Sequence, residues 1–142
     1  MQDYDSSTID LELERIEILN AFKGLLRAMK DRSREETKMV RKAFDIALEA
    51  HKDMRRKSGE PYIYHPIAVA QICAEEIGLG VRSTICALLH ETVEDTEITL
   101  EEVERDFGKE VASIVDGVTK LERLQFDSKE AQQAATMRKM LV

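Results

Sequence analysis

The chain has 142 residues, of which 43% are hydrophobic and 35% are charged, and its formal net charge is −7. This length suits one domain, and this composition supports a hydrophobic core beneath a charged surface, which excludes an intrinsically disordered chain. No run approaches the roughly 18 apolar residues of a membrane helix, and the acidic N-terminus lacks the basic start of a secretory signal. We therefore expect a cytoplasmic protein that does not contact a membrane.

Charge is distributed unevenly along the chain. Residues 21–58 contain 12 basic and 6 acidic side chains, whereas residues 1–20 contain 1 basic and 6 acidic ones. A protein that binds nucleic-acid duplexes usually has a high pI, but here the pI is about 5.1. A local basic cluster in an acidic chain better suits a small phosphorylated ligand, so we expect no direct nucleic-acid binding. Most of these charges are expected to form solvated helix surfaces.

The first half of the chain reads as two helices and a break. Apolar side chains at helical spacing predict an amphipathic helix over residues 8–30. A capping box from Ser33 to Glu36 predicts the start of a second helix, which should end near residues 52–56. The segment 58–61, which contains Gly59 and Pro61, breaks this pattern.

The second half continues with helices. Pro66 suits the first turn of a third helix, and a fourth is predicted from Val81 to just beyond His90. A capping box that begins at Thr99 predicts the start of a short helix, which Gly108 ends. An apolar face over residues 111–118 predicts another helix, and a last helix should follow residues 122–128. Because no segment alternates between polar and apolar residues, the predicted fold is all-α.

The chain has three histidines, and two of them have unusual neighbours. Carboxylates at Glu91, Glu94 and Asp95 follow His90 at the polar end of an apolar helix, and His65 stands before a proline at a turn. Imidazole and carboxylate groups together suit a divalent metal ion. On spacing alone, a histidine at the end of an apolar helix is more often a hydrogen-bonded structural group than a metal ligand.

Two further side-chain placements follow from local pattern. His51, which lies among charged residues at the end of the second helix, is predicted to be on the surface. Met137 and Met140 have helical spacing and are predicted to pack in the core. Cys73 and Cys86 lie in apolar runs and form no CxxC pair, which favours reduced thiols over a disulfide or a zinc finger.

Four motifs occur in order within residues 38–142: RKSGEPY at 56–62, YHP at 64–66, LLHETVEDT at 88–96 and DGVTKL at 116–121. In sequence and spacing they closely resemble the N-terminal hydrolase domain of the RelA/SpoT family. The resemblance implies a helical bundle of the HD type. It also implies manganese-dependent removal of the 3′-pyrophosphate of (p)ppGpp, which releases pyrophosphate and GDP or GTP in the bacterial stringent response.

The resemblance also implies a role for individual residues. The implied metal ligands are His65, His90 and Glu91, and the residues implied to handle the attacking water are Glu94 and Asp95. A carboxylate beside a metal ion can accept the proton of that water. The implied nucleotide-binding residues are Arg56, Lys57 and Ser58, because a guanidinium can stack on a purine or bind phosphate with two hydrogen bonds and an ammonium acts as a point charge.

The sequence departs from the family pattern in two places. The family has aspartate where this chain has Glu91, and a fourth metal ligand of the family is an aspartate in a later motif that this sequence does not contain. We therefore expect an N-terminal acidic helix over residues 1–32 and a partial HD-type domain over 33–142, incomplete at its C-terminal side. The expected parent is a longer bifunctional protein with a synthetase domain, and homo-oligomerisation through exposed apolar surface is a further expectation.

Two alternatives remain open from the sequence. Glu91 would also suit a domain that has lost hydrolysis and acts as a regulatory or nucleotide-sensing module for a downstream synthetase. A second alternative keeps the metal-dependent chemistry but changes the substrate to a phosphorylated nicotinamide cofactor, as in stand-alone relatives from animals. Arg56 and Lys57 do not distinguish between these substrates, whereas competition by guanine nucleotides would.

Overall fold

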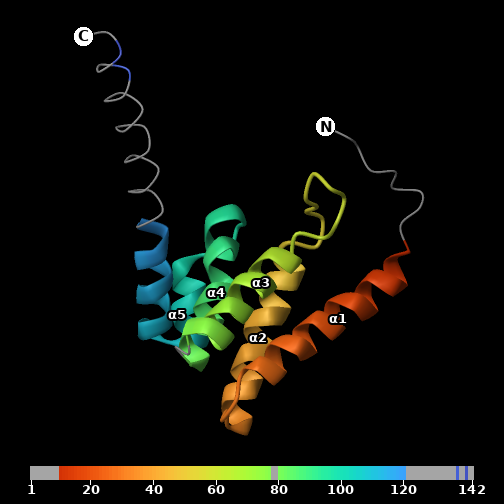
Figure 1. Ribbon diagram of the computed structural model, residues 1–142. Coiled ribbons are helices and arrows are strands. Elements are labelled where there is room, and N and C mark those ends of the chain that lie inside the picture. The colour runs from red at the N-terminus through yellow and green to blue at the C-terminus, as the bar shows by residue number, and fades with distance from the viewer. Residues whose placement is uncertain (1–9, 78–79, 121–136, 138–139, 141–142) are drawn as a thin grey trace.

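The computed structural model describes residues 10–77, 80–120, 137 and 140, and the described chain is all-α, as predicted. Its labelled helices are α1 (Leu11–Ala28), α2 (Arg34–Ala50), α3 (Tyr64–Ile72), α4 (Val81–Asp95) and α5 (Leu100–Phe107), shown in Figure 1. A π-helical turn, η2 (Cys73–Ile77), continues α3, and residues 109–120 form a further helix. These helices confirm the predicted order, whereas the predicted last helix lies largely outside the described residues.

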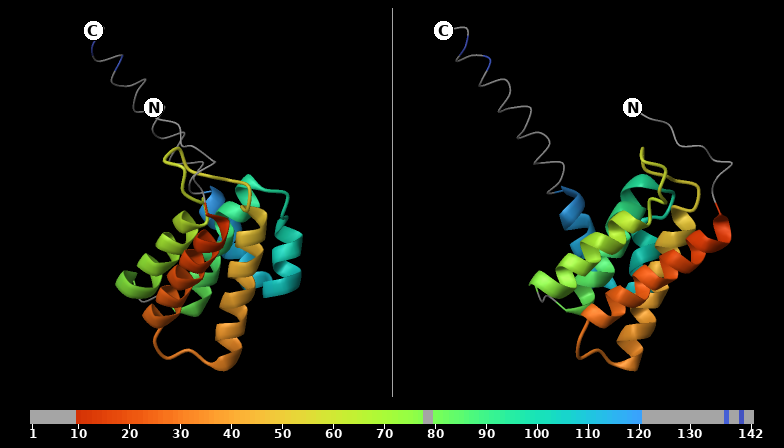
Figure 2. Two further views of the ribbon diagram at one scale, coloured as in Figure 1. Left: turned by 90° about the vertical axis from the view of Figure 1, so that its right-hand side faces the viewer. Right: turned by 45° about the vertical axis from the view of Figure 1, so that its right-hand side comes forward.

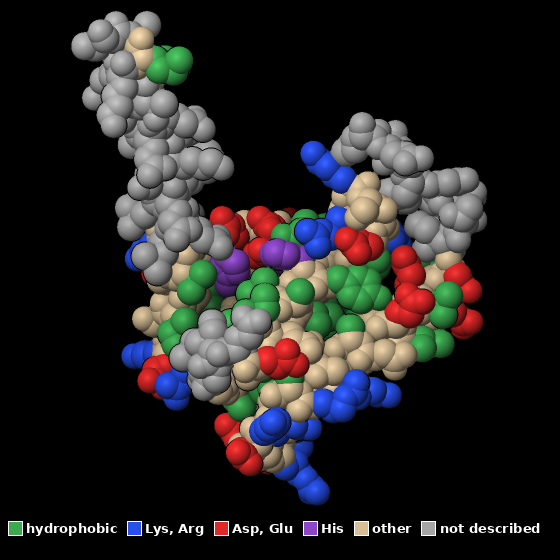
Figure 3. Space-filling view, viewed as in Figure 1, with side chains coloured by type: hydrophobic (Ala, Val, Ile, Leu, Met, Phe, Trp, Pro, Cys, Tyr) green, Lys and Arg blue, Asp and Glu red, His purple; other side chains and the backbone are tan. Residues whose placement is uncertain are grey.

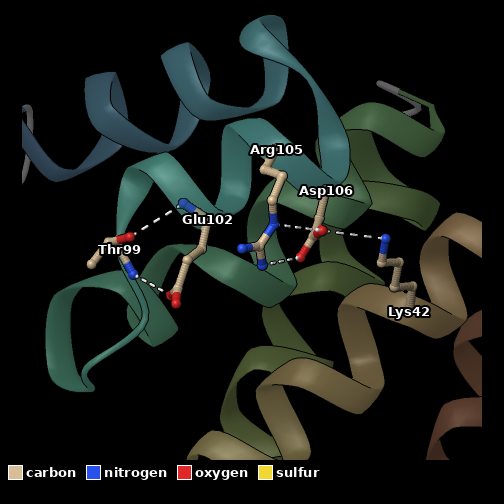
Figure 4. A network of polar contacts seen from close by, with 5 residues as sticks. All are labelled: Lys42, Thr99, Glu102, Arg105 and Asp106. Carbon is tan, nitrogen blue, oxygen red and sulfur yellow. Dashed lines mark hydrogen bonds and ion pairs between the residues drawn. The ribbon is translucent and has the colours of Figure 1, made fainter.

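Both predicted capping boxes are formed. The Ser33 hydroxyl accepts a hydrogen bond from the backbone N–H of Glu36 at 3.0 Å, and the Glu36 carboxylate accepts one from the Ser33 N–H at 2.9 Å. Thr99 and Glu102 make the same reciprocal pair at the start of α5 (Figure 4). Each cap satisfies backbone donors that a helix start leaves without partners and contributes about 1 kcal/mol.

Helix α5 is held on the bundle mainly by the burial of two apolar side chains. Val103 and Phe107 of α5 are buried, and the ammonium of Lys42 on α2 lies 5.5 Å from the centroid of the Phe107 ring. Asp106 adds ion pairs with Lys42 and with Arg105 (Figure 4). Because exposed pairs of this kind contribute about 0–1 kcal/mol, burial of the apolar side chains determines where α5 sits.

Helix α4 is the central element of the bundle and packs against α2 and α3 (Figure 2). Its buried side chains are Thr84, Ile85, Cys86, Leu88, Leu89, His90 and Thr92. Elsewhere in the core, Phe22 of α1 stacks on Phe44 of α2 with ring centroids 4.2 Å apart. This core fixes the direction of α4, so that its polar C-terminal end emerges beside the start of α3 (Figure 1).

Three predicted side-chain placements are wrong. His51 is 2% exposed, because it ends α2 in the core, where its Nδ1 lies 2.9 Å from the carbonyl oxygen of Ala47 and its ring lies 5.1 Å from that of Tyr62. Met137 and Met140 are 64% and 83% exposed, since helical spacing predicts a shared face but not a partner that covers it.

None of the described helices combines the length and apolar character needed to cross a membrane.

Candidate functional site

A short hairpin between α2 and α3 carries the basic motif. The backbone N–H of Tyr62 donates to the carbonyl of Met54 at 3.0 Å, and the N–H of Arg56 donates to the carbonyl of Glu60 at 2.9 Å. A tight turn closes the tip, where the N–H of Gly59 donates to the carbonyl of Arg56 at 2.8 Å. Gly59 has a φ of 94°, which glycine adopts without steric penalty, and this explains the glycine in the motif.

The three predicted nucleotide-binding residues, Arg56, Lys57 and Ser58, lie together at this tip, and all three are exposed. A guanidinium nitrogen of Arg56 lies 3.8 Å from Oε1 of Glu60, and the Ser58 hydroxyl donates to the same oxygen at 3.1 Å. One carboxylate oxygen thus contacts both side chains. A phosphate oxygen could contact the same two groups, because it is also an anionic acceptor.

Glu91 of α4 meets His65 of α3 at the foot of the hairpin. Oε1 of Glu91 lies 2.9 Å from Nε2 of His65, and the Tyr62 hydroxyl donates a hydrogen bond to Oε2 of Glu91. The Glu91 side chain is 16% exposed and that of His65 is 35% exposed, so this pair opens to solvent on the His65 side. Both carboxylate oxygens of Glu91 therefore have a partner.

Tyr62 connects the hairpin to this pair. Its pKa is raised above the usual value near 10, first by burial and then by its hydrogen bond to Glu91 and the negative charges of Glu91 and Asp95, whereas the charge of Arg56 acts in the opposite direction. Tyr62 therefore stays a neutral hydrogen-bond donor at physiological pH.

The remaining predicted residues lie on the last turns of α4. Nε2 of His90 is 3.8 Å from Oε2 of Glu94, and Asp95 is the last residue of the helix. Because the C-terminal end of a helix carries a partial negative charge, each carboxylate here is unfavourable by roughly 0.3–1 kcal/mol. Placing several carboxylates at this end lowers stability, and a nearby cation would offset that effect.

The donor atoms of His65 and Glu91 have the spacing of two ligands of one metal ion. Two ligand atoms bound at about 2.1 Å to one ion and at a right angle are about 3 Å apart, which matches the separation between Nε2 of His65 and Oε1 of Glu91. Across the described residues, however, no three His, Cys, Asp or Glu side chains already surround one point. The His65–Glu91 pair fits a divalent cation in donor type and spacing, and His90 supplies a further nitrogen next to Glu91 in sequence.

Figure 3 shows how these groups are distributed on the surface. Histidine and acidic side chains gather at the upper edge of the molecule, and Lys and Arg side chains lie next to them. Sequence reasoning missed three residues that contribute to this arrangement: Tyr62, Arg55 and Glu14. Tyr62 stands inside the recognised motif, but Glu14 is 41 positions from Arg55 and gave no signal in the sequence.

Comparison with known proteins agrees with these motifs. The chain is 49% identical over 105 residues to the GTP pyrophosphokinase of Streptomyces coelicolor, which covers 74% of this chain and 12% of that protein. It is 45% identical over 108 residues to the bifunctional (p)ppGpp synthase/hydrolase SpoT of Escherichia coli, which covers 76% of this chain and 15% of that protein. A guanosine-3′,5′-bis(diphosphate) 3′-pyrophosphohydrolase of Aquifex aeolicus is 44% identical over 93 residues, which are 66% of this chain and 13% of that protein.

These similarities confirm the resemblance to the RelA/SpoT proteins. The chain spans only 12–15% of the length of these relatives. The family described as HD domain matches residues 43–142, which include the hairpin, α3 and α4. With the all-α fold, and with His65 and His90 in the matched region, the chain belongs to the HD domain family.

Proposed function

We propose that this domain hydrolyses the 3′-pyrophosphate of (p)ppGpp in a metal-dependent reaction, releasing pyrophosphate and GDP or GTP. The observation that carries the proposal is the meeting of His65 and Glu91 at 2.9 Å beside a hairpin that presents Arg56, Lys57 and Ser58. Relatives named pyrophosphohydrolases and a bifunctional (p)ppGpp synthase/hydrolase support this choice of substrate.

In this proposal His65, His90 and Glu91 hold a divalent cation, for which manganese is our candidate. The unfavourable position of the carboxylates at the end of α4 supports a cationic occupant. When bound, such an ion would lower the pKa of a bound water and would neutralise charge that develops on the phosphate.

Other side chains of the domain are proposed to accept the proton, orient Glu91 and bind the phosphates. Glu94, whose Oε2 lies 3.8 Å from Nε2 of His90, and its neighbour Asp95 are proposed to accept the proton of the attacking water. Tyr62 holds the Glu91 carboxylate in place through its hydroxyl hydrogen bond. Arg56 and Lys57 neutralise phosphate charge, and Ser58 adds a hydrogen bond, when the nucleotide replaces Glu60 as the partner of Arg56 and Ser58.

We also propose the setting in which this activity operates. Residues 1–32 form an N-terminal acidic segment and residues 33–142 belong to the HD-type domain of a longer, bifunctional protein with a synthetase domain. The proposed setting is the bacterial cytoplasm, with (p)ppGpp as the ligand, a role in the stringent response, and assembly into homo-oligomers. The relatives, which are much longer than this chain and include a synthase/hydrolase, support the bifunctional parent.

The proposal is tested by titrating manganese into this chain and into a version extended beyond Val142, while ppGpp hydrolysis is followed in both. We expect tight manganese binding and release of pyrophosphate in the extended protein. Absence of both would contradict the assignment.

One observation favours a second function. Glu91 stands where the family has aspartate, which is also what a domain kept for nucleotide sensing or for restraint of a synthetase would tolerate. In that event ppGpp would bind at the hairpin and change synthetase activity, with no release of pyrophosphate. Measuring binding and hydrolysis in the same extended protein distinguishes the two functions.

A further inference from the structure

The hairpin that carries the basic motif is joined to α1, an element that precedes the residues matched by the HD domain family. Two guanidinium nitrogens of Arg55 donate to the two carboxylate oxygens of Glu14 on α1, at 2.6 and 2.8 Å. The pair spans 41 positions of sequence. It is therefore a tertiary contact, which depends on how α1 packs and not on the sequence next to either residue.

This ion pair differs from the exposed ion pairs that the described residues form. Both of its side chains are largely buried, at 19% exposed for Arg55 and 22% for Glu14, whereas Lys52–Glu49 and Arg82–Glu110 join side chains that are 56–74% exposed. The hydrogen bond from Arg55 lowers the pKa of the Glu14 carboxyl, against the opposing effect of burial. Bidentate, partly desolvated pairs are the kind that fix geometry, whereas exposed pairs contribute little.

The same guanidinium also holds the turn at the tip of the hairpin. Nη1 of Arg55 donates to the backbone carbonyl of Gly59 at 2.7 Å as well as to Glu14. Gly59 closes the turn that contains Lys57 and Ser58, since its N–H donates to the Arg56 carbonyl. One side chain thus links α1 to the segment that presents the basic residues.

We propose that Glu14 is a positioning residue for ligand binding: by orienting Arg55, it fixes the hairpin tip so that Arg56, Lys57 and Ser58 face a phosphorylated nucleotide bound beside His65 and Glu91. This inference rests on the proposed function for the identity of the ligand. The clamp between α1 and the hairpin does not depend on that function. Helix α1 thereby becomes part of the ligand-binding apparatus, although it lies outside the matched family region.

The clamp is tested first without nucleotide, by hydrogen exchange of the backbone amides of Arg56, Gly59 and Tyr62 in this chain. In Glu14→Gln we expect their exchange to accelerate by about tenfold, because a neutral amide replaces a charge-assisted, bidentate acceptor. Glu12→Gln removes the same charge from an exposed position of the same helix and should leave these rates unchanged.

The positioning role is tested in the extended protein with ppGpp and manganese. Glu14→Gln should raise KM by about fivefold with kcat within about twofold, because the loss lies in ligand binding. Unchanged exchange rates in Glu14→Gln would overturn the clamp. Faster exchange with an unchanged KM would overturn the positioning role. If the unsubstituted protein releases no pyrophosphate, the proposed hydrolysis fails, and the dissociation constant for ppGpp replaces KM in the same comparison.

Discussion

Oε1 of Glu91 lies 2.9 Å from Nε2 of His65, although the two residues are 26 positions apart and belong to different helices. The contact forms because α3 packs against α4 and the C-terminal end of α4 emerges beside the first turn of α3. Tyr62 binds the second oxygen of the same carboxylate. Glu91 is therefore held from two sides, and the glutamate at this position has a defined place in the fold.

Removing the imidazole of His65 should abolish the metal site. For His65→Ala we expect manganese affinity of the extended protein, measured by electron paramagnetic resonance of the free ion, to fall by more than about 100-fold. The side chain is 35% exposed, so the variant should remain folded, which a thermal melt checks. Unchanged ppGpp turnover in the extended His65→Ala protein would refute the site.

The Tyr62 hydroxyl should matter through Glu91. Tyr62→Phe keeps the ring beside His51 and His65 but removes the donor to Glu91, so manganese affinity should fall by roughly 10-fold to 100-fold. Tyr64→Phe, which deletes a hydroxyl two residues along the chain, serves as the matched control and should change the affinity by less than about twofold. Equal effects of the two substitutions would show that Tyr62 does not orient the carboxylate.

Substituting aspartate for Glu91 distinguishes a hydrolase that uses glutamate at this position from a domain that has lost hydrolysis. Since Glu91 reaches both Tyr62 and His65, Glu91→Asp should lose one of these contacts and leave ppGpp hydrolysis unchanged or lowered by up to about tenfold. The measurement is pyrophosphate release by the extended protein. A large gain in turnover would instead indicate a hydrolase that lost its activity with the aspartate, and would favour the sensing function.

Cys86 should make stability depend on alkaline pH. Burial raises the pKa of its thiol from 9.0 to about 11, and Sγ lies 3.9 Å from the carbonyl oxygen of Val111. The neutral thiol is favoured in the folded state, so its contribution is complete below about pH 9 and is lost as the pH rises toward about 11. Urea unfolding should show about 2 kcal/mol of this loss, and it should be absent in Cys86→Ala.

Cys73→Ala is the matched control for this pH dependence. Cys73 is only half-buried, and burial raises its pKa as well. Its removal should therefore change the alkaline loss of stability less than the removal of Cys86. The opposite order would contradict the burial argument.

Local sequence signals predicted the helices well. The capping boxes at Ser33 and Thr99 and the stop at Gly108 are formed where expected, because each depends on side chains and backbone within four residues. The same local reasoning misplaced His51, since the charged neighbours of this histidine in sequence are not its neighbours in the core. It also gave the residue types of the site but not their contacts.

The sequence by itself determined the all-α fold, the order of the described helices and the motifs that place the chain among HD domain proteins, because helical periodicity, caps and motif spacing are all properties of consecutive residues. Only the tertiary structure decided which side chains meet. The Glu91–His65 contact spans 26 positions and the Glu14–Arg55 contact spans 41. Such contacts depend on how α1, α3 and α4 pack, and a helical repeat specifies an apolar face without naming the helix that covers it.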